Sequence, residues 1–350
     1  MRFFECKTYV DDLNKSIAST VSIEKLKYKT VLVTGVTGTI GSFIVDMLIQ
    51  YNKQGAAIKI IAAGRNVDKI KKIYEGLVSS EELQIVQYDL SKNIEFDIDV
   101  DYIIHAAGNA HPVAFNSDPV GTIIGNINST YNLLEYGKCH KASRFCYISS
   151  GEIYGQGDLS LDSYDENYAG YLDNCMPRSC YPISKRAVEN LCASYYKQYG
   201  METIIVRPCH TYGPRITDTD SRANVQFMKC VLQDKDIVLT SPGLQLRSYC
   251  YIADCAAAIL TCMLNGKAGE AYNSANKESR VTIAEFAKVI ADLSGKKVVF
   301  SVPDETDLSN RTPIAKQVLS SDKLEKLGWK GNYSVELGVK HTLDILRDCN

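Results

Sequence analysis

The stretch Thr34-Gly35-Val36-Thr37-Gly38-Thr39-Ile40-Gly41 decides the fold. It follows the apolar run Thr30–Thr34, which predicts a buried strand, and it opens Gly41–Tyr51, whose apolar residues predict one face of a helix. Three glycines at this spacing, between a strand and a helix, are the fingerprint of a dinucleotide-binding turn. The sequence therefore predicts that a dinucleotide binds at the start of this helix.

Each position of this turn has a physical reason. Gly35 permits the tight turn, Gly38 lets the backbone approach a pyrophosphate, and Gly41 lets helix and strand pack closely. Thr39 and Ile40 stand directly before the predicted helix, at whose start free N–H groups and the helix dipole favour the negative phosphates. We therefore expect these five residues to bind the cofactor.

Strands and helices alternate along the following part of the chain. Further strands are predicted at Ala57–Ala63, Gln84–Tyr88, Tyr102–His105, Phe145–Ser149 and Thr203–Arg207. Further helices are predicted at Val67–Leu77, Thr122–Gly137 and Ser184–Tyr199. This alternation predicts an α/β fold of the Rossmann type, with a doubly wound parallel sheet covered on both faces.

The alternation loosens beyond about Arg207, where the loops grow longer. We expect an N-terminal extension at 1–28, an NAD(P)-binding domain at 29–206 and a smaller α/β substrate lobe over most of 207–350. Some segments of that lobe are free to return to the first domain. Within it, Thr282-Ile283-Ala284-Glu285 has the form of a capping box, which predicts the start of the helix Ile283–Leu293.

Composition and charge exclude several classes of partner. The net charge is −2, so we expect neither nucleic acid nor an anionic membrane as partner. No apolar run approaches the roughly 20 residues that span a bilayer. Met1 to Tyr28 carries charges throughout and has no signal-peptide core, so we expect a cytoplasmic protein. The twelve cysteines and five histidines show no ligand spacing, which predicts reduced thiols and no metal site.

Two charged residues follow the second and third predicted strands. An arginine near the second strand end can accept the 2′-phosphate of NADP(H), so Arg65 favours NADP over NAD; a solvated surface charge is the alternative. Asp89, followed by Leu90, ends the third strand, where a carboxylate can meet the adenine amine. A carboxylate that caps a turn is the alternative for Asp89.

The pattern Tyr-x-x-x-Lys, from Tyr181 to Lys185, puts both side chains on one face of a helix. Tyrosine ordinarily titrates near 10, and a neighbouring ammonium lowers its pKa by favouring phenolate. A phenol tuned in this way can remove a hydroxyl proton as hydride leaves the same carbon. We also expect Lys185 to hold the nicotinamide ribose.

The segment Ser149-Ser150-Gly151-Glu152-Ile153-Tyr154-Gly155 stands at the end of the fifth predicted strand. Ligands of doubly wound sheets bind beyond the carboxyl ends of the strands. Ser150 is therefore a candidate to hydrogen-bond the reacting oxygen, and Glu152 a candidate acid or base. A polar turn without chemistry is the alternative for this segment.

In this order and spacing, the three motifs resemble the extended short-chain dehydrogenase/reductase family, specifically its nucleotide-sugar epimerase/dehydratase branch. The resemblance covers roughly residues 29 to 346. Further segments that resemble the family are His105-Ala106-Ala107, the helical stretch 126–135, the stretch 207–215, the stretch 245–249 with Asp254, and Lys326-Leu327-Gly328-Trp329.

The resemblance implies roles for individual residues. It makes Ser150, Tyr181 and Lys185 the catalytic set. It implies cofactor contacts for Ala106, Ala107 and Asn126. It implies substrate contacts for Tyr154, His210, Arg222, Asn224 and Arg247. Arg247 would pair with the substrate diphosphate, a bidentate task that suits guanidinium better than ammonium. The resemblance also implies a nucleotide-sugar substrate and a homodimer.

Two positions depart from the family pattern. His210 stands where the family usually has Asn, which puts that substrate contact in doubt. Gly151 stands where sugar 4,6-dehydratases usually carry Asp, whereas Glu152 matches their Glu. Decarboxylases of nucleotide-linked glucuronate resemble this chain in keeping Glu without the Asp. Reductases of 4-keto-6-deoxy sugars also resemble its Ser-Gly-Glu, whereas epimerases commonly lack the Glu.

The resemblance thus implies a lyase-type enzyme that oxidises C4 of a nucleotide-sugar with NAD(P)+, acting as a 4,6-dehydratase or a glucuronate decarboxylase. Tyr181 would take the C4 hydroxyl proton, and Glu152 would assist elimination or decarboxylation. The alternatives among enzymes are a 4-epimerase and an NADPH-dependent 4-keto reductase. A non-catalytic NAD(P)-binding regulator is the alternative from another class, and the presence of Ser150, Tyr181 and Lys185 argues against it.

Overall fold

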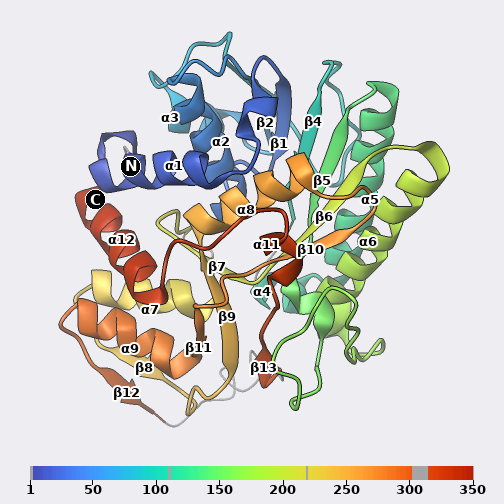
Figure 1. Cartoon of the computed structure of the whole chain (residues 1–350). Coiled ribbons are helices and arrows are strands. Elements are labelled where there is room, and N and C mark those ends of the chain that lie inside the picture. The colour runs from blue at the N-terminus through green and yellow to red at the C-terminus, as the bar shows by residue number, and fades with distance from the viewer. Residues whose placement is uncertain (1–2, 109–111, 218–219, 302–313, 350) are drawn as a thin grey trace.

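A parallel sheet of seven strands forms the centre of the molecule in this computed structural model, which describes residues 3–108, 112–217, 220–301 and 314–349 (Figure 1). The strand order is β10-β6-β5-β4-β1-β2-β3. The strands are β1 (Thr30–Thr34), β2 (Lys59–Gly64), β3 (Leu83–Gln87), β4 (Tyr102–His105), β5 (Arg144–Ile148), β6 (Thr203–Pro208) and β10 (Ala271–Ser274). The order reverses between β1 and β4, and ligands of doubly wound sheets bind at such a switch point. The predicted fold class is confirmed.

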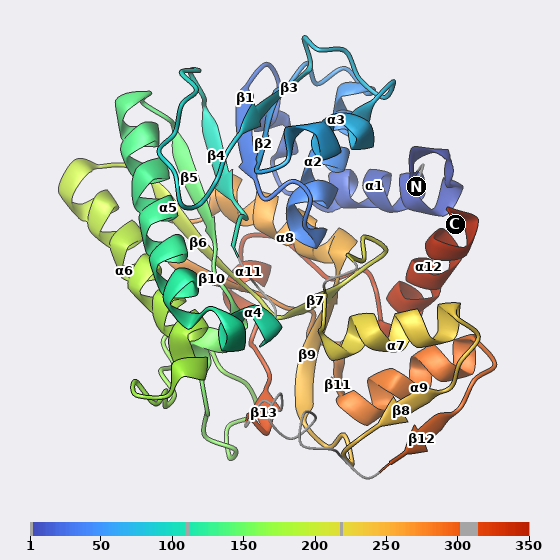
Figure 2. The same cartoon turned by 180° about the vertical axis from the view of Figure 1, so that it is seen from behind.

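Helices cover both faces of this sheet. The central strand β1 turns Val31 and Val33 toward one apolar core and Leu32 toward the other, as alternating side chains of a strand must. The first core includes side chains of α2 (Thr39–Asn52), α3 (Val67–Tyr74) and α8 (Ile252–Asn265). The second includes side chains of α5 (Pro119–Cys139) and α6 (Cys180–Tyr199), which lie side by side at one edge in both views (Figures 1 and 2).

Three helices begin earlier than predicted, namely α2 by two residues, α5 by three and α6 by four. Helix α5 starts at Pro119 because the Asp118 side chain accepts a hydrogen bond from the Gly121 N–H and proline suits the first helical position. Helix α6 starts at Cys180, so that Tyr181 belongs to its first turn. Tyr181 and Lys185 therefore do share one helix face.

The chain after β6 forms a second layer of structure beside the large sheet. Its four-stranded sheet contains β7 (His210–Tyr212), β9 (Leu246–Tyr251), β11 (Arg280–Thr282) and β13 (Lys316–Gln317). A separate pair joins β8 (Ile237–Leu239) and β12 (Val298–Phe300). Its helices include α7 (Ala223–Leu232), α9 (Ile283–Leu293), α11 (Asp322–Glu325) and α12 (Val335–Asp348). The capping box at the start of α9 is confirmed, with Thr282 and Glu285 each accepting from the backbone of the other.

Not all of this part stays in the second layer: strand β10 pairs with β6, and α8 packs on the large sheet. The N-terminal helix α1 (Lys7–Ser19) packs beside α2, and the chain termini lie close together in both views (Figures 1 and 2). Helices long and apolar enough to cross a membrane do not occur in the described ranges.

Candidate active site

A pocket of about 430 Å³ opens at the carboxyl ends of β1, β4, β5 and β6 and is closed from the other side by the second layer. Most of the residues predicted from the sequence meet there. The pocket is lined, among others, by Ile40, Ala106, Ala107, Ser150, Glu152, Tyr181, Lys185, His210, Arg222, Asn224 and Arg247. These residues come from segments as distant in sequence as α2 and β9, and the fold brings them together.

A short 3-10 helix, Gly151–Tyr154, directs the acidic side chain into this pocket. The Ser150 hydroxyl caps that helix by accepting a hydrogen bond from the Glu152 N–H at 3.1 Å. Because the chain turns at once after β5, both Ser150 and Glu152 line the pocket. The turn thus puts a hydroxyl and a carboxylate near one reacting group.

Burial dominates the titration of Tyr181. The side chain is 6% exposed, and desolvation followed by the negative charge of Glu152 raises the pKa of Tyr181 above its ordinary value. A hydrogen bond from Ser150 and the positive charges of Arg222 and Arg178 act in the opposite direction but are smaller. The expectation that a lysine ammonium lowers this pKa is wrong for the protein by itself, since burial outweighs nearby charge.

Lys185 is tuned in the same way. Its Nζ donates to the Ile148 carbonyl at 2.8 Å and lies 5.7 Å from the centre of the Tyr181 ring. Burial lowers the pKa of Lys185 to about 7. The amine is therefore poised between its neutral and charged forms near neutral pH, which suits a group that hands protons on.

The glycine turn is built as a dinucleotide requires. Gly35 has φ +72°, and a Cβ there would lie 2.6 Å from the Ala106 carbonyl oxygen. A Cβ on Gly41 would lie 2.5 Å from the Gly35 oxygen, so neither position tolerates a side chain. Gly38 is the N-cap of α2 and supplies no side-chain cap, which leaves first-turn N–H groups for an outside acceptor. The residues present therefore fit a bound pyrophosphate.

Two further cofactor candidates lie beyond the pocket, near the ends of β2 and β3. Arg65 is exposed directly after β2. Asp89 uses Oδ1 to accept hydrogen bonds from the N–H and hydroxyl of Ser91, and these bonds, with a smaller effect of Arg65, lower the pKa of Asp89. Asp89 thus caps a turn with one oxygen. The half-buried Leu90 lies close to Gly125.

Asn126 is 4% exposed and connects the cofactor side of the site to α6. Its Nδ2 donates to the Ser184 hydroxyl at 2.8 Å. Its Oδ1 and the Nζ of Lys185 both lie within 4.0 Å of where a Gly108 Cβ would stand. Asn126 therefore borders the space beside Lys185.

Two arginines, Arg247 and Arg222, also line the pocket. Arg247 is 2% exposed, and its guanidinium donates to the carbonyls of Leu246 and Ile314 but pairs with no carboxylate among the described residues. Arg222 pairs with Asp220. Burial, then the charges of Arg247 and Arg222, lowers the pKa of His210 to about 3, so this imidazole is neutral. A buried arginine without a carboxylate is a site for an anionic ligand.

Tyr154 is placed differently from the other candidates. It is fully buried, its hydroxyl donates to Asn273 Oδ1 at 2.7 Å and accepts from Arg207 at 2.9 Å. It is not among the residues that line the pocket. The 3-10 turn after Ser150 directs Glu152 inward and Tyr154 into the core.

Sequence reasoning missed many residues of the pocket wall, and two of them lie beside predicted site residues. Arg178 contacts Glu152 Oε2 through two nitrogens at 3.4 Å. Gln317 is 3% exposed, pairs in register with Arg247, and has an Nε2 without a partner among the described residues. For Arg178, the only sequence signal of a role in the site was its position three residues before Tyr181. For Gln317 there was no such signal, because β13 is only two residues long.

Comparison with known proteins agrees with this geometry. A model of the NAD dependent epimerase/dehydratase family matches residues 31–275. UDP-glucuronic acid decarboxylase 6 of Arabidopsis thaliana is 30% identical over 311 residues, 88% of this chain and 86% of the relative. UDP-glucuronic acid decarboxylase 1 of Xenopus tropicalis is 28% identical over 321 residues, 91% of this chain and 72% of the relative.

Solved structures share the fold at lower identity. UDP-glucose 4-epimerase of Thermotoga maritima, solved with UDP-glucose, has a TM-score of 0.75 at 22% identity, covering 91% of this chain and 99% of its own. The dTDP-glucose 4,6-dehydratase of Streptomyces venezuelae, solved with NAD, has a TM-score of 0.74 at 21% identity, covering 91% and 97%. The family model matches most of the chain, and the glycine turn and the pocket agree with that match. This chain therefore belongs to the NAD dependent epimerase/dehydratase family.

Proposed function

We propose that this enzyme is a lyase that decarboxylates UDP-glucuronate. The curated relatives at 28–30% identity are UDP-glucuronic acid decarboxylases. The pocket supports the proposal by combining a Tyr–Lys pair, Ser150 and Glu152 with Arg222 and Arg247. The first group suits a sugar, and the two guanidiniums suit a diphosphate.

The limited space at Gly151 favours decarboxylation over dehydration, and we base the choice between the two reactions on it. A Cβ there would lie 3.0 Å from Leu319 Cδ1 and 3.3 Å from the Pro208 carbonyl oxygen. An Asp at this position, as sugar 4,6-dehydratases carry, would therefore require Leu319 or the Pro208 backbone to move by a few tenths of an ångström. Glu152 remains as the acidic group of the segment.

Held at the glycine turn from Gly35 to Gly41, NAD(P)+ would supply the hydride acceptor for sugar C4 and, once reduced, the hydride donor that completes the cycle. Tyr181 removes the C4 hydroxyl proton as a phenolate, formed when its own proton passes toward the amine of Lys185, while Ser150 hydrogen-bonds the same C4 oxygen. The ketone at C4 accepts the electron pair of the breaking C5–carboxylate bond, so that CO2 leaves. Glu152 relays a solvent proton to C5, and Tyr181 returns its proton to the C4 oxygen. By gaining or losing a proton, the amine of Lys185 balances the charge on the Tyr181 oxygen during both proton transfers.

The test is incubation of the purified protein with UDP-glucuronate and dTDP-glucose, followed by mass spectrometry. We expect loss of CO2 from the first and no loss of water from the second. The variant Glu152→Gln should still accumulate reduced cofactor absorbance without forming product. Unaltered rate and product in that variant would contradict the lyase and favour an epimerase or a reductase.

We further propose that Arg65 binds the 2′-phosphate of NADP(H). It is exposed at the end of β2, where the adenine ribose of a doubly wound fold lies. Arg65→Ala should weaken NADP(H) binding more than NAD(H) binding in a fluorescence titration. Equal effects on both cofactors would make Arg65 a surface charge.

We also propose a homodimer through the outer face of α5 and α6. Large apolar side chains are exposed there, and they are Val120, Ile124, Tyr131, Tyr196 and Tyr199. A second copy would cover these side chains, and Tyr131→Glu should then convert a dimer to a monomer in light scattering.

A cytoplasmic location remains our proposal, supported by twelve free cysteines.

A further inference from the structure

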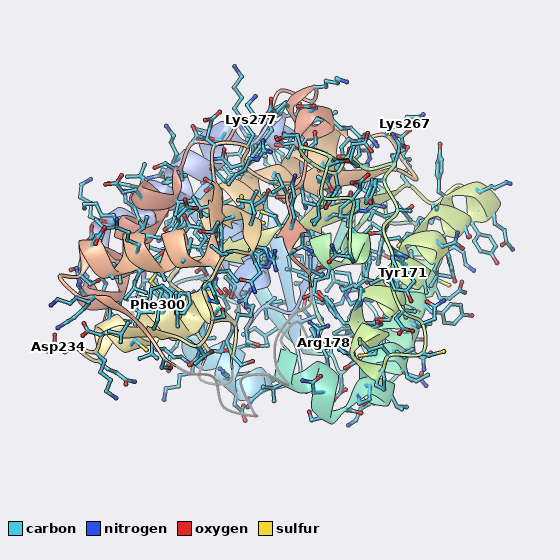
Figure 3. The ribbon with its side chains drawn as sticks, turned by 90° about the horizontal axis from the view of Figure 1, so that it is seen from below. Tyr171, Arg178, Asp234, Lys267, Lys277 and Phe300 are labelled. Atoms are coloured by element: carbon cyan, nitrogen blue, oxygen red, sulfur yellow. The ribbon has the colours of Figure 1, made fainter. Side chains whose placement is uncertain are left out.

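A third arginine lines the pocket besides the two that suit a diphosphate. Arg178 comes from the segment before α6, and Figure 3 shows it beside α4 (Pro112–Ser117). Its guanidinium carbon lies 4.7 Å from the centre of the Phe115 ring. Phe115 in turn stacks on Tyr181, with ring centres 4.4 Å apart and planes 16° apart. Arg178 is therefore held next to the reacting group.

The contact of Arg178 with Glu152 is loose. Both terminal nitrogens reach the same oxygen, Oε2, at 3.4 Å, whereas close ion pairs have N–O distances of about 2.7–2.9 Å. A guanidinium has five N–H donors, so this contact leaves Arg178 with capacity for a second carboxylate. Arg178 and Glu152 side chains are 21% and 28% exposed, which leaves both accessible from the pocket.

The charges of the pocket match an acidic sugar. A diphosphate carries charges that two arginines can bind, and the pocket has a third arginine, Arg178, in contact with Glu152. A neutral hexose offers that third guanidinium nothing that needs a cation. A sugar carboxylate beside Glu152 would be repelled by it, because like charges in one site repel, and Arg178 is in direct contact with Glu152.

We propose that Arg178 binds the carboxylate of the sugar and thereby selects a uronic acid over a neutral hexose. This inference rests on the proposed function. As the substrate carboxylate enters, it takes over donors of Arg178 that contact Glu152, and Glu152 becomes free to move a proton. Arg178 is thus a specificity-determining residue, and its cation–π contact with Phe115 fixes its position.

The experiment measures affinity without turnover. Tyr181→Phe protein loaded with cofactor is titrated calorimetrically with UDP-glucuronate, UDP-glucose and UDP, with and without Arg178→Gln. We expect Arg178→Gln to weaken UDP-glucuronate binding at least about tenfold, the value of a lost charged hydrogen bond. UDP-glucose and UDP should change less than about threefold. The UDP titration also verifies that the variant is folded.

A second pair of variants separates selection from mere pairing with Glu152. In a Glu152→Gln background, Arg178→Gln should still weaken the binding of UDP-glucuronate about tenfold. Loss of that effect, or equal weakening of UDP-glucuronate and UDP-glucose, would overturn the inference and make Arg178 a counter-ion of Glu152. If protein without these substitutions releases no CO2 from UDP-glucuronate, the proposed function itself fails. CO2 release together with an unselective Arg178→Gln variant removes this inference alone.

Discussion

Burial sets the protonation of the reacting side chains at the residue scale. Tyr181 and Lys185 are 6% and 4% exposed, and desolvation moves their pKa values in opposite directions, upward for the phenol and downward to about 7 for the amine. Both shifts favour the uncharged form, as burial does for an acid and a base alike. At neutral pH the phenol therefore rests protonated and uncharged, while the amine is divided between its neutral and charged forms.

Tyr181→Phe should keep cofactor and nucleotide-sugar binding but lower kcat by about 10²–10⁴-fold, because only the proton-transferring oxygen is removed. Steady-state kinetics and a binding titration measure the two effects separately. Tyr147→Phe is the matched control, since the Tyr147 hydroxyl is buried without a hydrogen-bond partner among the described residues. Near-normal turnover of Tyr181→Phe would remove Tyr181 as the base.

His105 predicts a loss of stability in acid. It is 1% exposed, and burial, then the charge of Lys185, lowers its pKa from 6.5 to about 3. The unfolded state therefore binds more protons between these values, and the free energy of unfolding falls as pH drops below 6.5. Each such histidine contributes a slope of at most about 1.4 kcal/mol per pH unit. Urea unfolding at several pH values should show a shallower slope in His105→Gln; an identical slope would contradict this origin.

At the scale of the element, the start of α2 depends on the absence of side chains. Gly35, Gly38 and Gly41 bring the backbone of the turn against β4 and against itself. Helix α5 contains a glycine of another kind, Gly125, whose Cβ would meet only Leu90 at 3.9 Å. Packing therefore requires glycine at the start of α2, whereas the glycine in α5 could be replaced by a residue with a small side chain.

Gly41→Ala should destabilise the protein by about 1–3 kcal/mol, because the new Cβ collides with the backbone of Gly35 and overpacks the turn. Gly125→Ala, the control, should be neutral or stabilise by up to about 1 kcal/mol through helix propensity. Thermal unfolding of both variants measures the difference. A Gly41→Ala protein as stable as Gly125→Ala would show that α2 shifts freely away from β1.

On the scale of the whole molecule, the N-terminal helix α1 ties the large sheet to the second layer. Tyr9 donates to Asp46 of α2 at 2.5 Å. From the same helix, Asp12 accepts hydrogen bonds from the hydroxyls of Tyr251 and Tyr333, and His341 of α12 lies 2.8 Å from its Oδ1. The predicted extension at 1–28 therefore packs as an integral part of the core.

Asp12→Asn should destabilise the protein by about 2–3 kcal/mol, because Asp12 is 1% exposed and an amide cannot accept all of these donors. Asp11→Asn on the same helix is the control. Its contact with Lys7 is exposed, so its loss should cost less than about 1 kcal/mol. Urea unfolding compares the two, and equal effects would exclude Asp12 as the link between the layers.

The spacing of residues along the chain was sufficient to predict the features that depend only on residues close in sequence. The strand, the glycine turn and the helix from Thr30 to Asn52 follow from apolar periodicity and from φ angles that only glycine adopts freely. The shared face of Tyr181 and Lys185 follows from the period of a helix. These features are encoded within a few residues, so the sequence was sufficient to predict them.

Only the tertiary structure decided what depends on burial and on distant segments. The raised pKa of Tyr181 and the neutral tendency of Lys185 arise from desolvation, which spacing does not reveal. Gln317 lies beside Arg247 because two strands 70 residues apart pair in register (317 − 247 = 70). Arg178 reaches Glu152 across the mouth of the pocket. The sequence by itself determined which groups are present and on which elements, whereas packing of remote elements in a low dielectric decided their neighbours and their charge.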